Sequence, residues 1–361
     1  MNGAAEMRTE PSWQIEEIPA LRGLAVEWAE AGRFVLSRQE RLFVAASLAP
    51  PFKPLGSFPA STARRLAARV RPAQRLLRFM YYNVLGLPGG SFFLTFDKCV
   101  GVLDADGLHL LEGLARPCRV LRGACAMDGA GDVYFGEYLV NPDRHEINVY
   151  RWVPGSRRIE IVRTFHAGSV RHVHGIYSEP GTRALWCVTG DTGDECRLMR
   201  TTDGFRTVDE VGGGDETWRT VSLLFRGGKI FYATDAEFRQ NVIYMLDPDT
   251  GARDIVEKLD GPVYYSAMAG DDLFFAVTAE LCPSQTSRSA TLWHVGADAY
   301  CGVIASFEKD PLPVSWFLPG TLNFARGPST EQGPIFQAVA LRGADAKTYR
   351  LNRTMQAQTS A

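Results

Sequence analysis

The chain has 361 residues, of which 45% are hydrophobic and 22% charged, as in an ordinary folded globular protein. Its 39 basic and 41 acidic residues leave a formal net charge of -2, so no basic excess is available to bind a nucleic acid. No apolar run approaches the roughly 18 residues of a membrane-spanning helix, and Met1–Trp13 lacks the apolar core of a secretory signal. We therefore expect a cytoplasmic protein without a transmembrane segment.

The seven cysteines are odd in number and include no CxxC pair, so a structural zinc site is not expected. Cys99 and Cys187 lie inside strand-like runs, where a free thiol acts as a small apolar side chain.

A unit of four short β-rich runs recurs along the chain, with turn-forming Gly, Asp and Pro between the runs. Residues 24–58 and 79–114 form the first two units. Four later units contain the runs GDVYFGEY, RALWCVTGD, GKIFYATD and DDLFFAVTAE, each preceded by one more short strand. Residues 316–351 supply only three strands, and residues 13–18 (WQIEEI) are expected to add the fourth and so close the ring.

A period of about 40–50 residues with four strands per unit is typical of propeller blades. The sequence therefore predicts an all-β fold, a single β-propeller domain over residues 1–361 with about seven four-stranded blades, six blades being the alternative.

One segment differs from this pattern. Residues 61–78 (STARRLAARVRPAQRLLR) contain six arginines and aliphatic residues at helical spacing, which predicts a short helical insertion between the first two blades. We expect it to pack over one face of the propeller. A basic amphipathic helix could also contact an anionic membrane or an acidic glycan.

In a propeller, the loop between the second and third strands of each blade and the segment before the next first strand emerge on the same face. Polar residues at these places should therefore meet, although they are far apart in sequence. The candidate catalytic residues at these places are Glu137, His172, His174, Asp191 and Asp235, and the candidate substrate-binding residues are Arg171, Glu195, Trp218, Arg219, Asn241 and Tyr265.

His172 and His174 are two residues apart in a strand, so their side chains point to the same side. This spacing suits a divalent metal ion or a pair of proton-transfer groups, or histidines that only form hydrogen bonds around the channel. Asp191 and Asp235 could likewise bond the amides of their own loops. Arg219 could bind a sugar acid or neutralise nearby acids.

Together these residues favour a carbohydrate-active enzyme that acts on a small-molecule or oligosaccharide ligand. Two carboxylates across a channel can serve a glycoside hydrolase, and a histidine-bound metal can assist the elimination that a lyase catalyses. The alternative is a non-catalytic propeller that binds a glycan or a protein, because the fold hosts many functions.

The turn Thr201–Thr207 (TTDGFRT) resembles the S-x-D-x-G-x-T-W turn of sialidase-like, Asp-box propellers, although one residue is missing before Gly204 and Val208 replaces the aromatic. The resemblance implies a site with three convergent arginines and a Tyr/Glu nucleophile pair, and Arg171 and Arg219 are candidates for two of the arginines.

Two other families share features with the sequence. His172-x-His174 is similar to the histidine-bound metal site of cytoplasmic oligogalacturonate lyases. The run FYATDAEFRQNVIYMLDPDTG is similar to the blades of lactonase-type propellers, which hold a divalent ion with acid and Asn ligands. This second resemblance implies a metal-dependent lactonase-type hydrolase as a further alternative.

Overall fold

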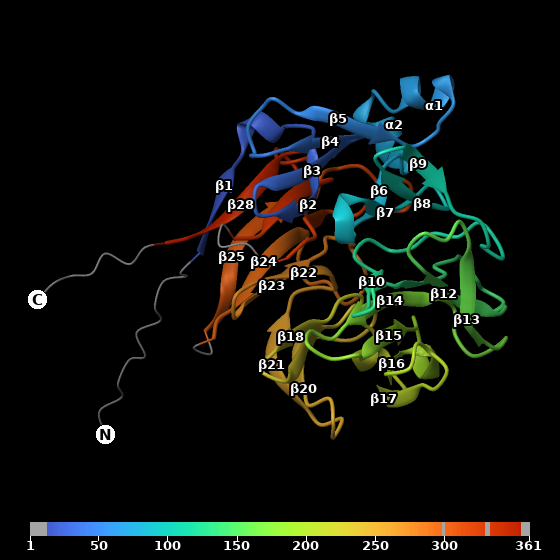
Figure 1. Cartoon of the computed structure of the whole chain (residues 1–361). Helices are drawn as coiled ribbons and strands as arrows, with labels where there is room; N and C mark the ends of the chain where they lie inside the picture. The colour runs from blue at the N-terminus through green and yellow to red at the C-terminus, as the bar shows by residue number, and fades with distance from the viewer. Residues whose placement is uncertain (1–12, 298–299, 329–332, 355–361) are drawn as a thin grey trace, which may run out of the picture.

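Seven four-stranded antiparallel sheets form a ring in the computed structural model, which describes residues 13–297, 300–328 and 333–354 (Figure 1). The fold is thus a β-propeller, as the repeat predicts, with seven blades rather than six. We number the blades along the chain by their first strands.

The first four blades contain strands β2 to β17. Blade one contains β2 (Ala25–Glu30), β3 (Arg33–Arg38), β4 (Arg41–Ala45) and β5 (Lys53–Ser57). Blade two contains β6 (Tyr81–Gly86), β7 (Phe92–Phe96), β8 (Cys99–Asp104) and β9 (Gly107–Leu110). Blade three contains β10 (Ala126–Met127), β11 (Val133–Gly136), β12 (Ile147–Trp152) and β13 (Ile159–Phe165). Blade four contains β14 (Val173–Ser178), β15 (Leu185–Thr189), β16 (Arg197–Thr201) and β17 (Asp209–Gly213).

The remaining strands form three blades. Blade five contains β18 (Leu224–Arg226), β19 (Lys229–Ala233), β20 (Asn241–Leu246) and β21 (Arg253–Leu259). Blade six contains β22 (Val263–Ala269), β23 (Asp272–Val277), β24 (Ser289–Val295) and β25 (Cys301–Glu308). Blade seven contains β26 (Thr321–Phe324), β27 (Ile335–Val339), β28 (Thr348–Arg353) and β1 (Trp13–Glu17).

Blade seven joins the two ends of the described chain. Strand β1 pairs antiparallel with β28, so that Trp13 lies opposite Arg353 and Glu17 lies opposite Tyr349. The blue β1 and the red β28 lie side by side in Figure 1. This pairing covers the outer edge of β28, which would otherwise be free to pair with another chain.

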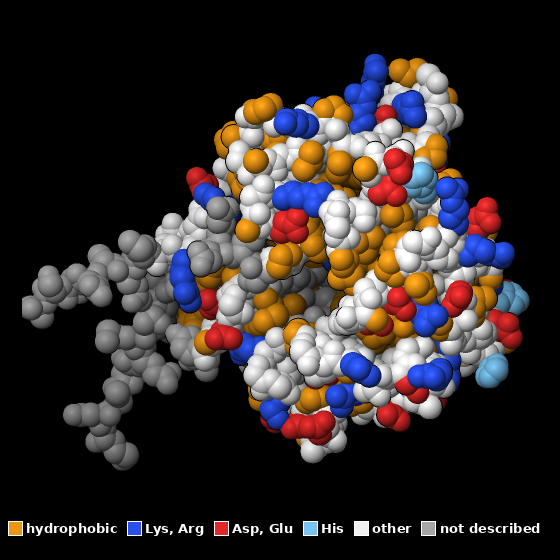
Figure 2. All heavy atoms as spheres, viewed as in Figure 1, with side chains coloured by type: hydrophobic (Ala, Val, Ile, Leu, Met, Phe, Trp, Pro, Cys, Tyr) orange, Lys and Arg blue, Asp and Glu red, His pale blue; other side chains and the backbone are white. Residues whose placement is uncertain are grey.

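Two short helices, α1 (Thr62–Ala67) and α2 (Arg71–Leu77), lie between β5 and β6. Val70 between them has an extended backbone, and a proline follows in the first turn of α2, where its missing N–H costs no helical hydrogen bond. Arg71 binds Asp345 with two hydrogen bonds of 2.9 and 2.8 Å, and Arg75 binds Asp310, so α2 is fixed to the loops of blades six and seven. Basic side chains are prominent around these two helices (Figure 2).

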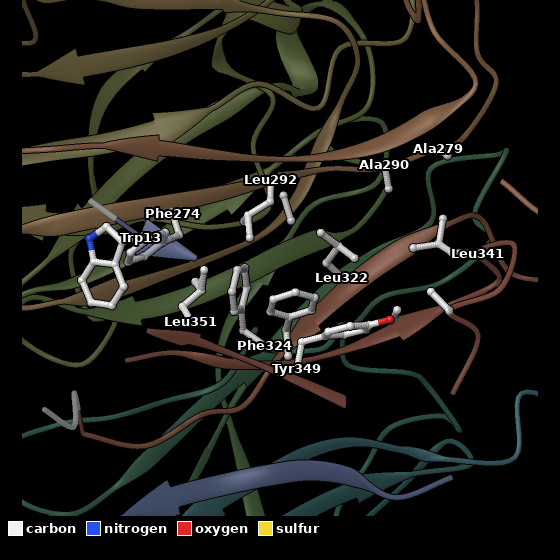
Figure 3. Packing of buried hydrophobic residues seen from close by; sticks show 14 residues of the cluster. Trp13, Phe274, Ala279, Ala290, Leu292, Leu322, Phe324, Leu341, Tyr349 and Leu351 are labelled. Atoms are coloured by element: carbon white, nitrogen blue, oxygen red, sulfur yellow. The ribbon is translucent and has the colours of Figure 1, made fainter. Parts of the chain in front are cut away.

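The hydrophobic core lies between neighbouring blades, where one cluster of buried residues fills each interface. Figure 3 shows the cluster between blades six and seven, where the rings of Trp13 and Phe274 meet edge to face with centroids 5.1 Å apart. Each large side chain buried in this way contributes roughly 1.5–3 kcal/mol. Because the blades are held by these interfaces, their loops can vary on a rigid frame.

All seven cysteines are free. Within the described ranges, no helix has the length and apolar composition that crossing a membrane requires.

Candidate functional site

A cavity of about 220 Å³ opens on the face where the loops of blades three to six converge. We call it the site cavity. Seven of the residues selected from the sequence line it, namely Arg171, His172, His174, Asp191, Arg219, Asp235 and Tyr265. The propeller topology therefore brings together most of the predicted site residues, although they come from three blades, four to six.

The two histidines are fixed by the backbone. His172 precedes β14, and His174 lies at a bulge in β14, where pairing with β15 skips one residue. Their Nδ1 atoms lie 2.9 Å from the Leu139 carbonyl and 3.0 Å from the Thr220 carbonyl. Because a carbonyl can only accept a hydrogen bond, each Nδ1 carries the ring proton. In the neutral rings each Nε2 then has a free lone pair.

These lone pairs converge on Asp191. The two Nε2 atoms are 3.1 Å apart, and each lies 3.2 Å from Asp191 Oδ1. Burial, the largest influence, lowers the pKa of His174 to about 4, so this ring is neutral at neutral pH. Burial alone would raise the pKa of Asp191, but the neighbouring histidines outweigh it and lower this pKa below its usual range. The two Nε2 atoms and the Asp191 carboxylate are thus three potential ligand atoms that lie within 4.8 Å of one another.

This spacing fits a metal ion. Two ligand atoms that bind one ion at about 2.1 Å, with an angle of about 90–110°, are separated by roughly 3.0–3.4 Å. The separations of 3.1 and 3.2 Å fall in this range. The carbonyl partners of both Nδ1 atoms also supply the outer hydrogen bonds that orient metal-binding histidines. His172, His174 and Asp191 could therefore hold a divalent ion from one side and leave positions open to the cavity.

Two arginines flank this group. Arg171 Nη1 donates to Asp191 Oδ2 at 2.8 Å, and Arg219 Nη1 donates to the Asp191 carbonyl at 3.1 Å. Arg219 also donates from Nε to Asp235 Oδ2 at 3.1 Å. Both guanidinium groups line the cavity, where they favour an anionic ligand.

Asp235 and Glu280 are two cavity carboxyls with raised pKa values, for both of which burial is the main cause. Asp235 Oδ1 is buried without a hydrogen-bond partner. Glu280 accepts a 2.6 Å hydrogen bond from the hydroxyl of Tyr264. Burial outweighs the opposing charge of Arg219 and raises the pKa of Asp235 to about 8, so this carboxyl can exchange a proton near neutral pH. Two such neighbours can divide the roles of base and acid.

Four predicted site residues lie outside the cavity lining. The carboxylate of Glu137 is buried within blade three, where it accepts hydrogen bonds from Tyr150 and Asn148. Glu195 accepts hydrogen bonds from the Arg144 side chain and the Arg171 backbone, at 2.7 and 3.1 Å.

Trp218 and Asn241 are equally engaged elsewhere. The Trp218 ring packs under the Arg253 guanidinium at 3.8 Å and covers Gly212, where a side chain would collide with it. Asn241 holds the loop of blade five through Ala236 and Ser284. Neither side chain lines the site cavity.

Other lining residues were not selected from the sequence, among them Arg122, Tyr138, Glu237, Tyr264 and Glu280. Glu280 follows the second strand of blade six at nearly the place that Asp235 occupies in blade five, and this register was its only signal. The Tyr138 ring packs on His172 with centroids 4.1 Å apart. Nothing local in the sequence marks Arg122.

No family model and no curated protein matches the chain. Among solved structures, it is similar to an oligogalacturonate lyase in complex with manganese, with a TM-score of 0.64 and 7% identity over 94% of this chain and 93% of that chain. It is also similar to the WD40 repeats of RRP9, with a TM-score of 0.56 and 10% identity over 94% of this chain and 98% of that one. A third similar structure is YCF48 bound to a D1 peptide, with a TM-score of 0.56 and 10% identity over 94% and 95% of the two chains.

At these identities the similarity shows the β-propeller fold alone, which is found both in an enzyme and in WD40 proteins. The sialidase-like resemblance stays limited to the Thr201–Thr207 turn. There the Asp203 carboxylate accepts hydrogen bonds from Thr207 and Thr201 and closes the hairpin between β16 and β17.

Proposed function

We propose that the protein is a metal-dependent carbohydrate-active enzyme, a lyase that cleaves a sugar acid in the site cavity. The observation that carries this proposal is the convergence of the His172, His174 and Asp191 lone pairs at 3.1–3.2 Å beside two arginines. The fold shared with an oligogalacturonate lyase in complex with manganese supports it.

When bound by these three residues, a divalent ion supplies Lewis-acid chemistry, which makes the C–H next to a sugar carboxylate more acidic. Arg171 and Arg219 would orient that carboxylate. Asp235 would take the proton at its free Oδ1. The C–O bond to the leaving sugar then breaks as a C=C bond forms, and Glu280 would protonate the leaving oxygen.

The test is turnover of acidic oligosaccharides with manganese present, followed through the ultraviolet absorbance of the unsaturated product. His174→Ala should lower the rate by about 100-fold or more and should weaken manganese binding in calorimetry by a similar factor. His145→Ala is the matched control, because this histidine is exposed away from the cavity, and it should change neither quantity. Chelation should stop turnover by the unsubstituted protein. Turnover that survives both chelation and His174→Ala would contradict the proposal.

A second candidate is a metal-free glycoside hydrolase of the sialidase type, and a separate observation favours it. Arg122, Arg171 and Arg219 all line the cavity, and Tyr264 donates to Glu280 at 2.6 Å. The Tyr264 oxygen would attack the anomeric carbon as the bond to the leaving sugar oxygen breaks, Glu280 would take the phenolic proton, and Asp235 would protonate the leaving oxygen. However, burial raises the pKa of Tyr264 well above its usual value, which weakens it as a nucleophile. A saturated product, loss of turnover in Tyr264→Phe and indifference to chelation would favour this mechanism.

Two further alternatives are less well supported. A lactonase-type site needs Asn ligands, but the amides of Asn141 and Asn241 are engaged within their own loops. A non-catalytic propeller would bind an acidic sugar in the same cavity and give no product in any of these assays.

A further inference from the structure

A second cavity, of about 450 Å³, lies on the same face as the site cavity, above blades one and seven and beside the helical insertion. Its lining residues come from the same kinds of loops, since Arg22 precedes the first strand of blade one and Arg38 ends the second strand. Five arginines line it, so we call it the arginine cavity: Arg22, Arg38, Arg69, Arg71 and Arg122.

Three of these arginines are not neutralised. The only acids that line the cavity are Glu27 and Asp345. Glu27 accepts two hydrogen bonds from Arg122, at 2.7 and 2.6 Å, and Asp345 accepts two from Arg71. Over the described part of the chain, Arg22, Arg38 and Arg69 form no such ion pair. The cavity therefore carries an excess of positive charge in a concave surface, which favours an anion with several charges.

The cavity also offers neutral hydrogen-bonding groups. The amides of Gln39, Asn323 and Gln337 line it, and Asn323 lies opposite Gln337 in the pairing of β26 with β27. Asn323 Oδ1 is buried without a hydrogen-bond partner, so it lacks a donor such as a sugar hydroxyl. Guanidinium groups suit carboxylates and amides suit hydroxyls, and a sugar acid carries both.

The two cavities are neighbours, because Arg122 lines both. We propose that the arginine cavity binds the further residues of an acidic oligosaccharide whose reacting residue lies in the site cavity. The placement of the reacting residue rests on the proposed function, whereas binding of the acidic chain does not. On this inference the substrate is a chain of several uronic acid residues, and the helical insertion forms one wall of its binding groove through Arg69 and Arg71.

The experiment measures dissociation constants by calorimetry on the chelator-treated full-length protein, so that turnover cannot interfere. The probes are galacturonate, mannuronate and glucuronate, each as a monomer and as a hexamer. The double variant Arg38→Gln/Arg69→Gln removes two unpaired guanidinium groups. The matched control is Arg183→Gln/Arg206→Gln, which removes the same charge from exposed turns on the opposite face.

We expect at least one acidic hexamer to bind more tightly than its monomer. Arg38→Gln/Arg69→Gln should weaken the binding of that hexamer by about tenfold or more. In Arg38→Gln/Arg69→Gln the dissociation constant for the monomer should change by less than about twofold. In the control variant the dissociation constants for both monomer and hexamer should change by less than about twofold. Melting temperatures should match, because neither pair holds the fold through an ion pair. Equal hexamer affinity in the two double variants, or no preference for a hexamer in any of the three series, would overturn the inference.

Leu66, Val70 and Leu76 are exposed on the insertion, so anionic lipid vesicles serve as a competing probe. If Arg38→Gln/Arg69→Gln loses binding to phosphatidylserine vesicles and keeps its hexamer affinity, the surface docks on membranes and the inference fails.

The inference and the proposed lyase function can fail separately. Length-dependent binding without any unsaturated product would leave this inference standing and remove the lyase function, and turnover without length dependence would do the reverse.

Discussion

Blades three, four and five each carry an acid within two residues of the end of the second strand, yet the three acids have different roles. In blade three, Glu137 accepts hydrogen bonds from the Tyr150 hydroxyl at 2.6 Å and the Asn148 amide at 3.0 Å, and it is fully buried. In blade four, Asp191 meets two histidines and an arginine in the cavity, and in blade five Asp235 keeps one oxygen without a partner. The repeat places the backbone, and partners from distant parts of the chain decide whether an acid supports the fold or faces a ligand.

The largest effect is expected at the cavity acid of blade five. Asp235→Asn removes the proposed base and should lower turnover by about 100- to 10,000-fold. Burial raises the pKa of Asp235, so the folded chain binds this proton more tightly than the unfolded chain. The free energy of unfolding that protonated Asp235 contributes is therefore lost progressively as the pH rises from the pKa in the unfolded chain through the raised pKa in the folded chain.

The stability of Asp235→Asn relative to the unsubstituted protein should accordingly increase with pH, as measured by urea unfolding near pH 5 and pH 8. The exposed Asp254→Asn on β21 is the control and should show no such trend. A difference that stays constant across this range would show that Asp235 is not perturbed by burial.

A smaller effect, on stability rather than turnover, is expected in blade three. Glu137→Gln replaces a buried acceptor with an amide beside Arg116, whose guanidinium lies 3.2 Å from the carboxylate. The free energy of unfolding should fall by about 3 kcal/mol, because a buried charged partner is lost. Urea unfolding measures this, with the exposed Glu160→Gln as the control. If Glu137→Gln instead abolished turnover with its stability intact, Glu137 would belong to the catalytic group.

The smallest effect is expected at the hairpin on the opposite face of blade four. Thr201 is buried, and its hydroxyl donates to Asp203 and accepts from the Phe205 amide at 3.0 and 3.1 Å. Thr201→Val keeps the side-chain shape and should cost about 1 kcal/mol of stability without changing manganese affinity. Thr202→Val, at the exposed neighbouring position, should be neutral. A change in manganese affinity would mean that the two faces of the blade are coupled.

The fold was largely predictable because its signal is local and repeated. Alternating apolar runs and Gly/Asp turns recur in every blade, and one short run before the first blade was left over to pair with β28. The meeting of His172, His174 and Asp191 was also predictable, because propeller topology fixes which loops share a face.

The partners of individual side chains were not predictable. Glu137 and Asp191 both follow a glycine at the end of a second strand, and nothing nearby in the sequence says that Tyr150 and Arg116 engage only the first. Arg122 reaches the cavity through its contact with Glu27, which is 95 residues away in the chain. Such contacts depend on how neighbouring blades pack, and a pattern within one blade does not record them.

The pairing of β1 with β28 has a consequence for how the protein is made. The ribosome synthesises Trp13 before blade one, and its strand partner Arg353 emerges only after six blades have been produced. Until then the nascent chain exposes an unpaired β1 and an apolar flank of blade one, and closing so long a loop is entropically slow. We expect the growing polypeptide to depend on chaperones until β28 has been synthesised, and a fusion before β1 that delays its pairing should reduce the soluble yield more than the same fusion at a surface loop.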